Sequence, residues 1–242
     1  QQKTDAAIWG TARPGAKVTI RTGWSKDRTV VPADAVTGKW LARIKTPAAG
    51  GPYEIVISDG EAVSLKNVLV GEVWLCSGQS NMEMPMKGYG SQPAKGATDF
   101  ILRAKASTPI RICNIARKSS AKVLDASEGS WVENTPNSVA NTSATAYYFA
   151  ETLQAATDVP VGIIVSCWGG STIEAWMKRD VMEKDFPEFN LGHLDGTRKV
   201  RHDNQDPCLL FNGQIAPLLP YSIKGIIWYQ GEANRSRPDQ YV

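Results

Sequence analysis

Three short apolar runs, each followed by a polar loop that contains glycine, constrain the fold of this 242-residue chain most strongly. The runs lie at residues 70–75, 161–165 and 223–229, and their β-branched and aromatic residues predict buried strands. The middle run is almost continuously apolar, as expected for a parallel strand that is covered on both faces. The sequence therefore predicts, for residues 69–242, an α/β domain with an open, mostly parallel sheet flanked by helices.

One of the flanking helices is predicted between the first two of these runs. Apolar residues recur with the helical period over residues 146–153, and Ser143 stands before them as a candidate N-cap. Pro160 prevents the helix from continuing. Residues 180–206 are polar and irregular, which indicates a surface excursion, and the basic stretch 198–202 within it is interpreted as a solvated loop.

Residues 1–68 have a different pattern, which is all-β. Alternating segments at 16–22, 38–44 and 53–57 are separated by turns rich in glycine and proline. Short strands at this spacing predict a small β-sandwich module that precedes the α/β domain. A packing or spacer role is the preferred interpretation of this module over carbohydrate binding.

The loop after the first run carries the strongest candidate for chemistry. It places the hydroxyl of Ser80 at the carboxyl edge of the sheet, where open α/β sheets form their sites. Gly78-Gln79-Ser80-Asn81-Met82, after Gly71-Glu72-Val73-Trp74, resembles the first block of the SGNH hydrolases, and most closely that of the sialate O-acetylesterase-like branch. Trp168-Gly169-Gly170-Ser171 and Trp228-Tyr229-Gln230-Gly231-Glu232 resemble the second and third blocks.

The resemblance implies an SGNH-hydrolase-like fold and a carbohydrate esterase with Ser80 as its nucleophile. Acyl transfer also needs donors for the developing oxyanion, and the resemblance assigns these to the Gly170 backbone N–H and the Gln230 side-chain amide. Supporting roles fall to three neighbours of these groups, namely Gln79, Asn81 and Glu232. Taken singly, each has an ordinary structural alternative: a tight turn for the glycines, loop hydrogen bonds for Gln230, and a helix cap for Glu232.

The aromatic and cationic residues near these loops are candidates for binding the sugar. Aromatic faces suit the C–H surfaces of a sugar, which nominates Trp168, Trp176 and Tyr229, with core packing as the alternative. A substrate that carries a carboxylate would be favoured by a cation such as Arg235 or Arg237.

The sequence does not contain the general base of the reaction at the position where the resemblance predicts it. The resemblance implies an Asp-x-x-His block after the third loop, in which the histidine accepts the serine proton and the aspartate orients it. The two histidines, His193 and His202, precede the third loop and lack this spacing. We therefore expect the catalytic His and Asp beyond Val242, in a C-terminal remainder of the same protein, and an α/β domain that is incomplete in this chain.

These features predict a serine esterase that removes O-acetyl groups from a glycan, with acetylated sialic acid as the substrate that the resemblance suggests. Acetylated xylan or another polysaccharide is the alternative substrate, and a non-catalytic glycan-binding protein on a degenerate hydrolase fold is the alternative class. This chemistry needs no metal ion and no organic cofactor.

Charge and hydropathy restrict the partners further. A net charge of +3 argues against nucleic acid as the main partner, and no apolar run is long enough for a membrane span. Cysteines 76, 113, 167 and 208 lack metal-type spacing and are interpreted as buried thiols, with one disulfide as the alternative. Esterases with such an N-terminal module are usually exported, which predicts a periplasmic, secreted or lysosomal protein.

Overall fold

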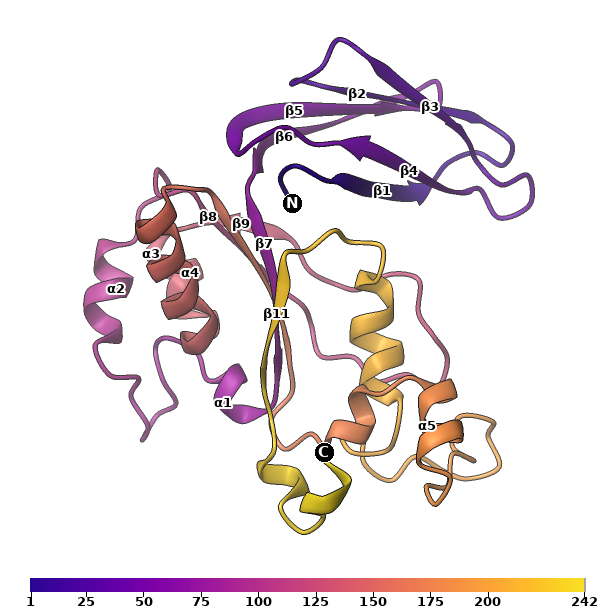
Figure 1. Ribbon diagram of the computed structural model, residues 1–242, viewed down its shortest axis with the longest axis vertical. Helices are drawn as coiled ribbons and strands as arrows, with labels where there is room; N and C mark the ends of the chain where they lie inside the picture. The colour runs from indigo at the N-terminus through magenta and orange to yellow at the C-terminus, as the bar shows by residue number, and fades with distance from the viewer. Residues whose placement is uncertain (242) are drawn as a thin grey trace.

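The computed structural model describes residues 1–241, in which Figure 1 shows an upper and a lower group of strands. The upper group consists of β1 (Asp5–Thr11), β2 (Lys17–Thr22), β3 (Arg28–Pro32), β4 (Lys39–Lys45), β5 (Gly50–Ser58) and β6 (Ala62–Val70). β1 pairs with β4, and β3-β2-β5-β6 form a second sheet, with antiparallel pairing throughout. Side chains from both sheets, including Ile20, Trp40 and Ile55, belong to one buried cluster.

The lower group is a five-stranded sheet in the order β11-β7-β10-β8-β9. Its strands are β7 (Glu72–Gly78), β8 (Ile110–Asn114), β9 (Trp131–Glu133), β10 (Val161–Cys167) and β11 (Gly225–Tyr229). All neighbours are parallel except β9, which runs antiparallel to β8. The mixed α/β architecture predicted from the apolar runs is therefore confirmed.

Helices cover both faces of this sheet, as Figure 1 shows, with α2, α3 and α4 on one side and α5 on the other. The helices are α1 (Ser80–Glu83), α2 (Ala97–Arg103), α3 (Pro136–Ala140), α4 (Ala144–Thr157) and α5 (Arg179–Asp185). Single turns of other helical types occur at η1 (Ile173–Trp176), η2 (Phe211–Ile215), η3 (Ala216–Leu218), η4 (Glu232–Asn234) and η5 (Pro238–Gln240). The Ser143 side chain accepts a hydrogen bond from the Ala146 N–H, which confirms the predicted N-cap of α4.

Strand β10 is buried on both of its faces, which explains its uninterrupted apolar sequence. Ile163 belongs to the buried cluster that α4 covers, whereas its neighbour Ile164 belongs to the cluster on the opposite face, against Ile215 and Leu218. Successive side chains of a strand point to opposite faces, so a sheet with two covered faces requires apolar residues at consecutive positions.

Two segments differ from their predicted conformation. The polar excursion 180–206 is not wholly irregular, because α5 occupies its beginning. The short helix expected at residues 210–216 forms instead as the π-helical turn η2 followed by the 3₁₀ turn η3. Within residues 1–241, no helix has the length and apolarity needed to cross a membrane.

The four cysteines are buried free thiols in the part of the chain that the structure describes, as predicted. Burial raises the pKa of Cys113 and of Cys208 to about 11 and that of Cys76 to about 12. The pKa of Cys167 is raised as well, mainly by burial. These thiols therefore stay protonated at neutral pH, and none of them is suited to act as a nucleophile.

We expect the native protein to react with iodoacetamide at pH 8 about 100-fold more slowly than the urea-unfolded protein, because the thiolate is the reactive form. Above about pH 8.5 the unfolded thiols lose protons that the folded thiols retain, so the free energy of unfolding should fall as the pH rises. Mass spectrometry of alkylated peptides and urea titrations in reducing buffer at pH 8.0 and 9.5 measure the two effects. A cysteine labelled equally fast in both states would contradict this account.

Candidate active site

The ends of β11, β7 and β10 lie side by side, which brings the three predicted loops to one edge of the sheet. Gly78 is paired in register with Tyr229 on one side and with Cys167 on the other. The Gln79 N–H donates to the Tyr229 carbonyl at 3.0 Å, and the Trp168 N–H donates to the Gly78 carbonyl at 3.1 Å. The loops therefore continue the pairing of their strands for one further residue.

Ser80 begins the short helix α1 directly after β7. Gly78 has a φ of +143°, and a Cβ there would collide with the Tyr229 carbonyl, so the sharp turn before Ser80 requires glycine. The Ser80 side chain is exposed, and within residues 1–241 neither its hydroxyl nor its backbone N–H is paired in a hydrogen bond. The serine is thus presented at the surface with a free hydroxyl and a free backbone donor.

In the second loop, Gly169 rather than Gly170 lies against the serine. A Cβ on Gly169 would stand 3.6 Å from Ser80 Cβ, and the Gly169 N–H is bound to Glu83 Oε2 at 2.8 Å. Gly170 has a φ of +73° and is exposed, and no acceptor within residues 1–241 is paired with its N–H. Of the two glycines, Gly170 therefore keeps a free backbone donor.

The carbonyl groups of the same two glycines are held by the polar excursion. Asn204 Nδ2 donates to the Gly169 carbonyl at 2.8 Å, and Gln205 Nε2 donates to the Gly170 carbonyl at 3.1 Å. Because both carbonyl groups are hydrogen-bonded, the backbone conformation of the loop is fixed. The conformation of the second loop therefore depends on two side-chain amides that lie 35 residues later in the sequence.

Gln230 differs from its predicted arrangement. Its Nε2 donates both to the Ser171 carbonyl at 3.0 Å and to Asn234 Oδ1 at 2.7 Å, while its Oε1 is buried without a partner in the described residues. Both amide hydrogens are therefore occupied, and the side chain joins the third loop to the second. To serve as an oxyanion donor, Gln230 would have to give up one of these two hydrogen bonds.

The supporting residues bind the first loop to the third. Gln79 Oε1 accepts from the N–H groups of Gly231 at 3.3 Å and Ala233 at 3.2 Å. Asn81 Nδ2 donates to Glu232 Oε1 at 2.5 Å. These contacts place all three predicted supporting residues between two loops, where they hold the serine turn in position.

A buried carboxylate below the loops was not predicted as a site residue. Glu174 is 3% exposed, and both of its oxygens accept from Asn234 Nδ2 at 3.1 Å. Arg237, predicted as a candidate for the substrate carboxylate, instead forms a 2.7 Å ion pair with Glu174. Such a buried charge is tolerated because it is both paired and hydrogen-bonded.

The residues predicted to bind the sugar differ in their exposure to solvent. Trp168 is half-buried in the second loop, and Arg235 is exposed. Trp176 is 8% exposed and its indole donates to Ser171 Oγ at 2.9 Å, so it packs beneath the second loop and presents no free ring face. Tyr229 is exposed at the edge strand β11.

Two charged residues beside Ser80 escaped the sequence analysis. Glu83 lies one helical turn after Ser80, and Arg117 follows β8, which is separated from β7 in the sheet by β10. Arg117 donates to Glu83 Oε1 through Nε at 2.7 Å, and its guanidinium lies 5.6 Å from the centre of the Trp168 ring. The i, i+3 spacing of Ser80 and Glu83 was the available indication that Glu83 lies beside the serine, whereas no pattern in the sequence indicated its pairing with Arg117.

His193 has no ring nitrogen free to accept a serine proton. It is buried, with Nδ1 bound to Arg198 at 2.7 Å and Nε2 to the Pro207 carbonyl at 2.8 Å. Since arginine only donates, Nδ1 is the acceptor and Nε2 carries the proton. His202 is exposed in the same excursion. Among residues 1–241, no three His, Cys, Asp or Glu side chains are grouped to hold a metal ion.

Comparisons with known proteins agree on the class of this chain. A family model described as carbohydrate esterase, sialic acid-specific acetylesterase, matches residues 70–241. Sialate O-acetylesterases of Pongo abelii and Homo sapiens are each 29% identical over 252 residues, covering 97% of this chain and 46% of their own length. The chain therefore spans about half the length of these curated relatives.

A solved structure shows the same relationship. A carbohydrate acetylesterase from Xanthomonas citri is 35% identical and superimposes with a TM-score of 0.82, covering 97% of this chain and 49% of that one. The similarity thus extends over the upper strands as well as the α/β part.

Replacing Glu83 tests how the second loop is held. In Glu83→Ala, the Gly169 N–H loses its acceptor, and its hydrogen exchange should become about 10-fold faster or more. Glu83→Gln keeps an acceptor oxygen and should show a smaller change. Glu151→Ala, which removes the surface ion pair with Arg103, is the matched control. Equal exchange at Gly169 in all variants would show that Glu83 does not hold this loop.

Proposed function

Because this chain belongs to the sialic acid-specific acetylesterase family of carbohydrate esterases, we propose that it carries the nucleophilic half of a glycan O-acetylesterase site. The single observation that carries this proposal is the position of Ser80. It follows one of three strands that end side by side, with an unpaired hydroxyl and a free N–H of its own, and Gly170, which also has a free N–H, comes directly after the Gly169 that lies against the serine.

The proposed reaction proceeds through an acetyl-enzyme. Ser80 Oγ attacks the acetyl carbonyl carbon while a general base takes the hydroxyl proton, and the Oγ–C bond forms. The ester C–O bond then breaks, and the sugar oxygen leaves with that proton. Water, deprotonated by the same base, attacks the acetyl carbon, and acetate departs as Ser80 recovers its proton. No metal ion or organic cofactor takes part.

The Ser80 and Gly170 N–H groups are the proposed oxyanion donors. Both are backbone groups of loops held by several hydrogen bonds, so they need little reorganisation when negative charge develops. Gln230 is the proposed third donor only if a bound substrate displaces its bond to Ser171 or Asn234. In its present arrangement, its contribution is to hold the two loops together.

The base is proposed to come from a further part of the protein that carries the Asp-x-x-His block. Within the described residues β11 is an edge strand, and Ile226, Trp228 and Tyr229 on it are 59%, 38% and 46% exposed. An open edge with large apolar side chains is suited to accept another strand or a covering segment. This edge adjoins the third loop, so a segment packed there would reach the site. The half-length match to the relatives supports the same view.

Acetylated sialic acid is the proposed substrate, by analogy with the named relatives, and acetylxylan is the alternative. We further propose that residues 1–68 form a separate β-sandwich module, that residues 69–242 belong to an SGNH-hydrolase-like domain, and that the protein is exported. A non-catalytic glycan-binding role is the second candidate function. The observation that favours it is the absence, among residues 1–241, of a histidine with a free ring nitrogen in contact with Ser80.

Ser80→Ala in the full-length protein should lower acetate release from acetylated sialic acid or acetylated xylan by at least about 1000-fold, because the attacking oxygen is lost. Near-ultraviolet circular dichroism should remain unchanged, since the side chain is exposed. Ser91→Ala is the matched control, because this serine is exposed like Ser80 but lies in another loop. Full activity of the Ser80 variant would remove this residue from the mechanism.

The origin of the base can be tested separately. Residues 1–242 alone should hydrolyse p-nitrophenyl acetate poorly compared with the full-length protein, since a serine without its base retains only the contributions of binding and the oxyanion hole. Equal turnover by the two forms would show that the base lies within residues 1–242.

A further inference from the structure

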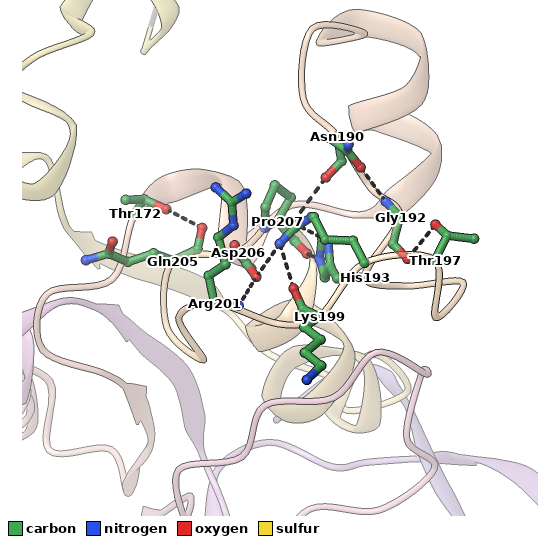
Figure 2. A network of polar contacts seen from close by, with 11 residues as sticks. Thr172, Asn190, Gly192, His193, Thr197, Lys199, Arg201, Gln205, Asp206 and Pro207 are labelled. Atoms are coloured by element: carbon green, nitrogen blue, oxygen red, sulfur yellow. Dashed lines mark hydrogen bonds and ion pairs between the residues drawn. The ribbon is translucent and has the colours of Figure 1, made fainter.

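A cavity of about 350 Å³ borders the second loop and is lined mainly by residues of the polar excursion. Its lining residues are Thr172, Phe189, Asn190, Arg198, Arg201, His202, Gln205, Asp206, Pro207 and Arg237. Figure 2 shows the loop that carries Lys199, Arg201 and Gln205 folded around this region. The basic stretch 198–202, interpreted from sequence as a solvated loop, therefore contributes to the wall of a cavity.

The wall of the cavity is held together by a network of hydrogen bonds centred on Arg198. Arg198 Nη1 donates to Asp206 Oδ2 at 3.0 Å, and its Nη2 donates to His193 Nδ1 at 2.7 Å. Further bonds run from the same guanidinium to the carbonyls of Lys199 and Asn190. The Arg201 N–H donates to Asp206 Oδ2 at 2.8 Å. The one carboxylate in the lining is thus already neutralised by Arg198 and a backbone donor.

Two guanidinium groups retain donors that the framework does not use. Arg201 is an exposed residue whose side chain has no hydrogen-bond partner among residues 1–241, and no dashed line reaches its guanidinium in Figure 2. Arg237 forms an ion pair with Glu174 through Nη2, while its Nε is buried without a partner in the described chain. The buried Arg237 N–H is costly without an acceptor, and the exposed guanidinium of Arg201 has its donors available for an anionic ligand.

The remaining lining and the position of the cavity indicate what carries the anion. Phe189 and Pro207 add apolar surface next to the charged groups, a combination that suits the C–H face and the acid group of a sugar. Gln205 lines the cavity and also donates to the Gly170 carbonyl, and Thr172 bonds to the Gln205 carbonyl at 3.0 Å. The cavity therefore shares a wall with the loop that supplies the proposed oxyanion donor.

We propose that this cavity binds the carboxylate of an acidic sugar residue of the glycan, with Arg201 as the main donor. A guanidinium binds a carboxylate through two parallel hydrogen bonds, which gives both affinity and orientation. The assignment of the ligand to a glycan rests on the proposed function. Of the two cations predicted from the sequence, Arg237 lines this cavity and Arg235 does not, and Arg201 joins Arg237 as a residue that selects for acidic sugars.

The test is calorimetric titration of the full-length protein with sugars that bear no acetyl ester. D-Glucuronate and D-glucose form a matched pair that differs in the carboxylate, and N-acetylneuraminate is a second acid of another class. We expect at least one acid to bind and glucose to bind at least about 10-fold more weakly. Equal binding of the acid and the neutral sugar would overturn the proposal. So would the absence of binding of either acid at a concentration of about 10 mM.

Two variants with the same change of charge locate the site. Arg201→Gln should weaken binding of the acid about 10-fold or more, whereas Lys199→Gln, on an exposed residue outside the lining, should leave it within about twofold. Equal losses in both variants would indicate only long-range attraction and would overturn the assignment. Competition by inorganic sulfate at the affinity of the sugar acids would likewise reduce the cavity to a general anion site.

The same titrations separate this proposal from the proposed function. Ser80→Ala should bind the acids with unchanged affinity, although it should lose hydrolysis of p-nitrophenyl acetate. If the acids bind in a way that depends on Arg201, the cavity proposal holds even if Ser80 is unnecessary for catalysis. If Ser80→Ala loses hydrolysis, the proposed function holds even if neither acid binds.

Discussion

The geometry of the candidate site depends on two main-chain hydrogen bonds that continue the sheet past its last strand residues. They join Gln79 to Tyr229 and Trp168 to Gly78, and so connect three loops that are distant in sequence. Gly78 makes this possible, because only a residue without Cβ can adopt its backbone angles against the Tyr229 carbonyl. Ser80 is exposed at a defined position because the chain turns there under these constraints.

Side chains then secure the loops in two layers. Near the surface, Glu83 binds the Gly169 N–H and Arg117, while Gln79 and Asn81 reach the third loop. Below them, Asn234 binds Gln230 and the buried Glu174. Hydrogen bonds to charged partners are stronger than neutral ones, so the two carboxylates strengthen both layers. The donors left free at the surface are backbone groups, which suits a site that stabilises a developing negative charge.

The sequence allowed the sheet and the position of Ser80 to be predicted, because both depend on local patterns. Apolar runs identify buried strands, and the residues that follow each run fall at the same edge in any parallel sheet. The pairing of Glu83 with Arg117 and of Glu174 with Arg237 could not be predicted, since these partners are 34 and 63 residues apart. The occupied amide of Gln230 and the cavity around Arg201 depend on the same long-range packing.

The polar excursion has a further consequence for how such a site diversifies. Asn204 and Gln205 hold the carbonyl side of the second loop, and the residues around them form the cavity on its outer side. The segment that supports the loop is therefore also the segment that meets the ligand beyond it. Substitutions of Arg201 and His202, whose side chains take no part in the framework around Arg198, change the chemistry of that wall without altering the two amides or the serine turn. On the proposed function, ligand preference and reaction chemistry would therefore reside in separate stretches of the chain.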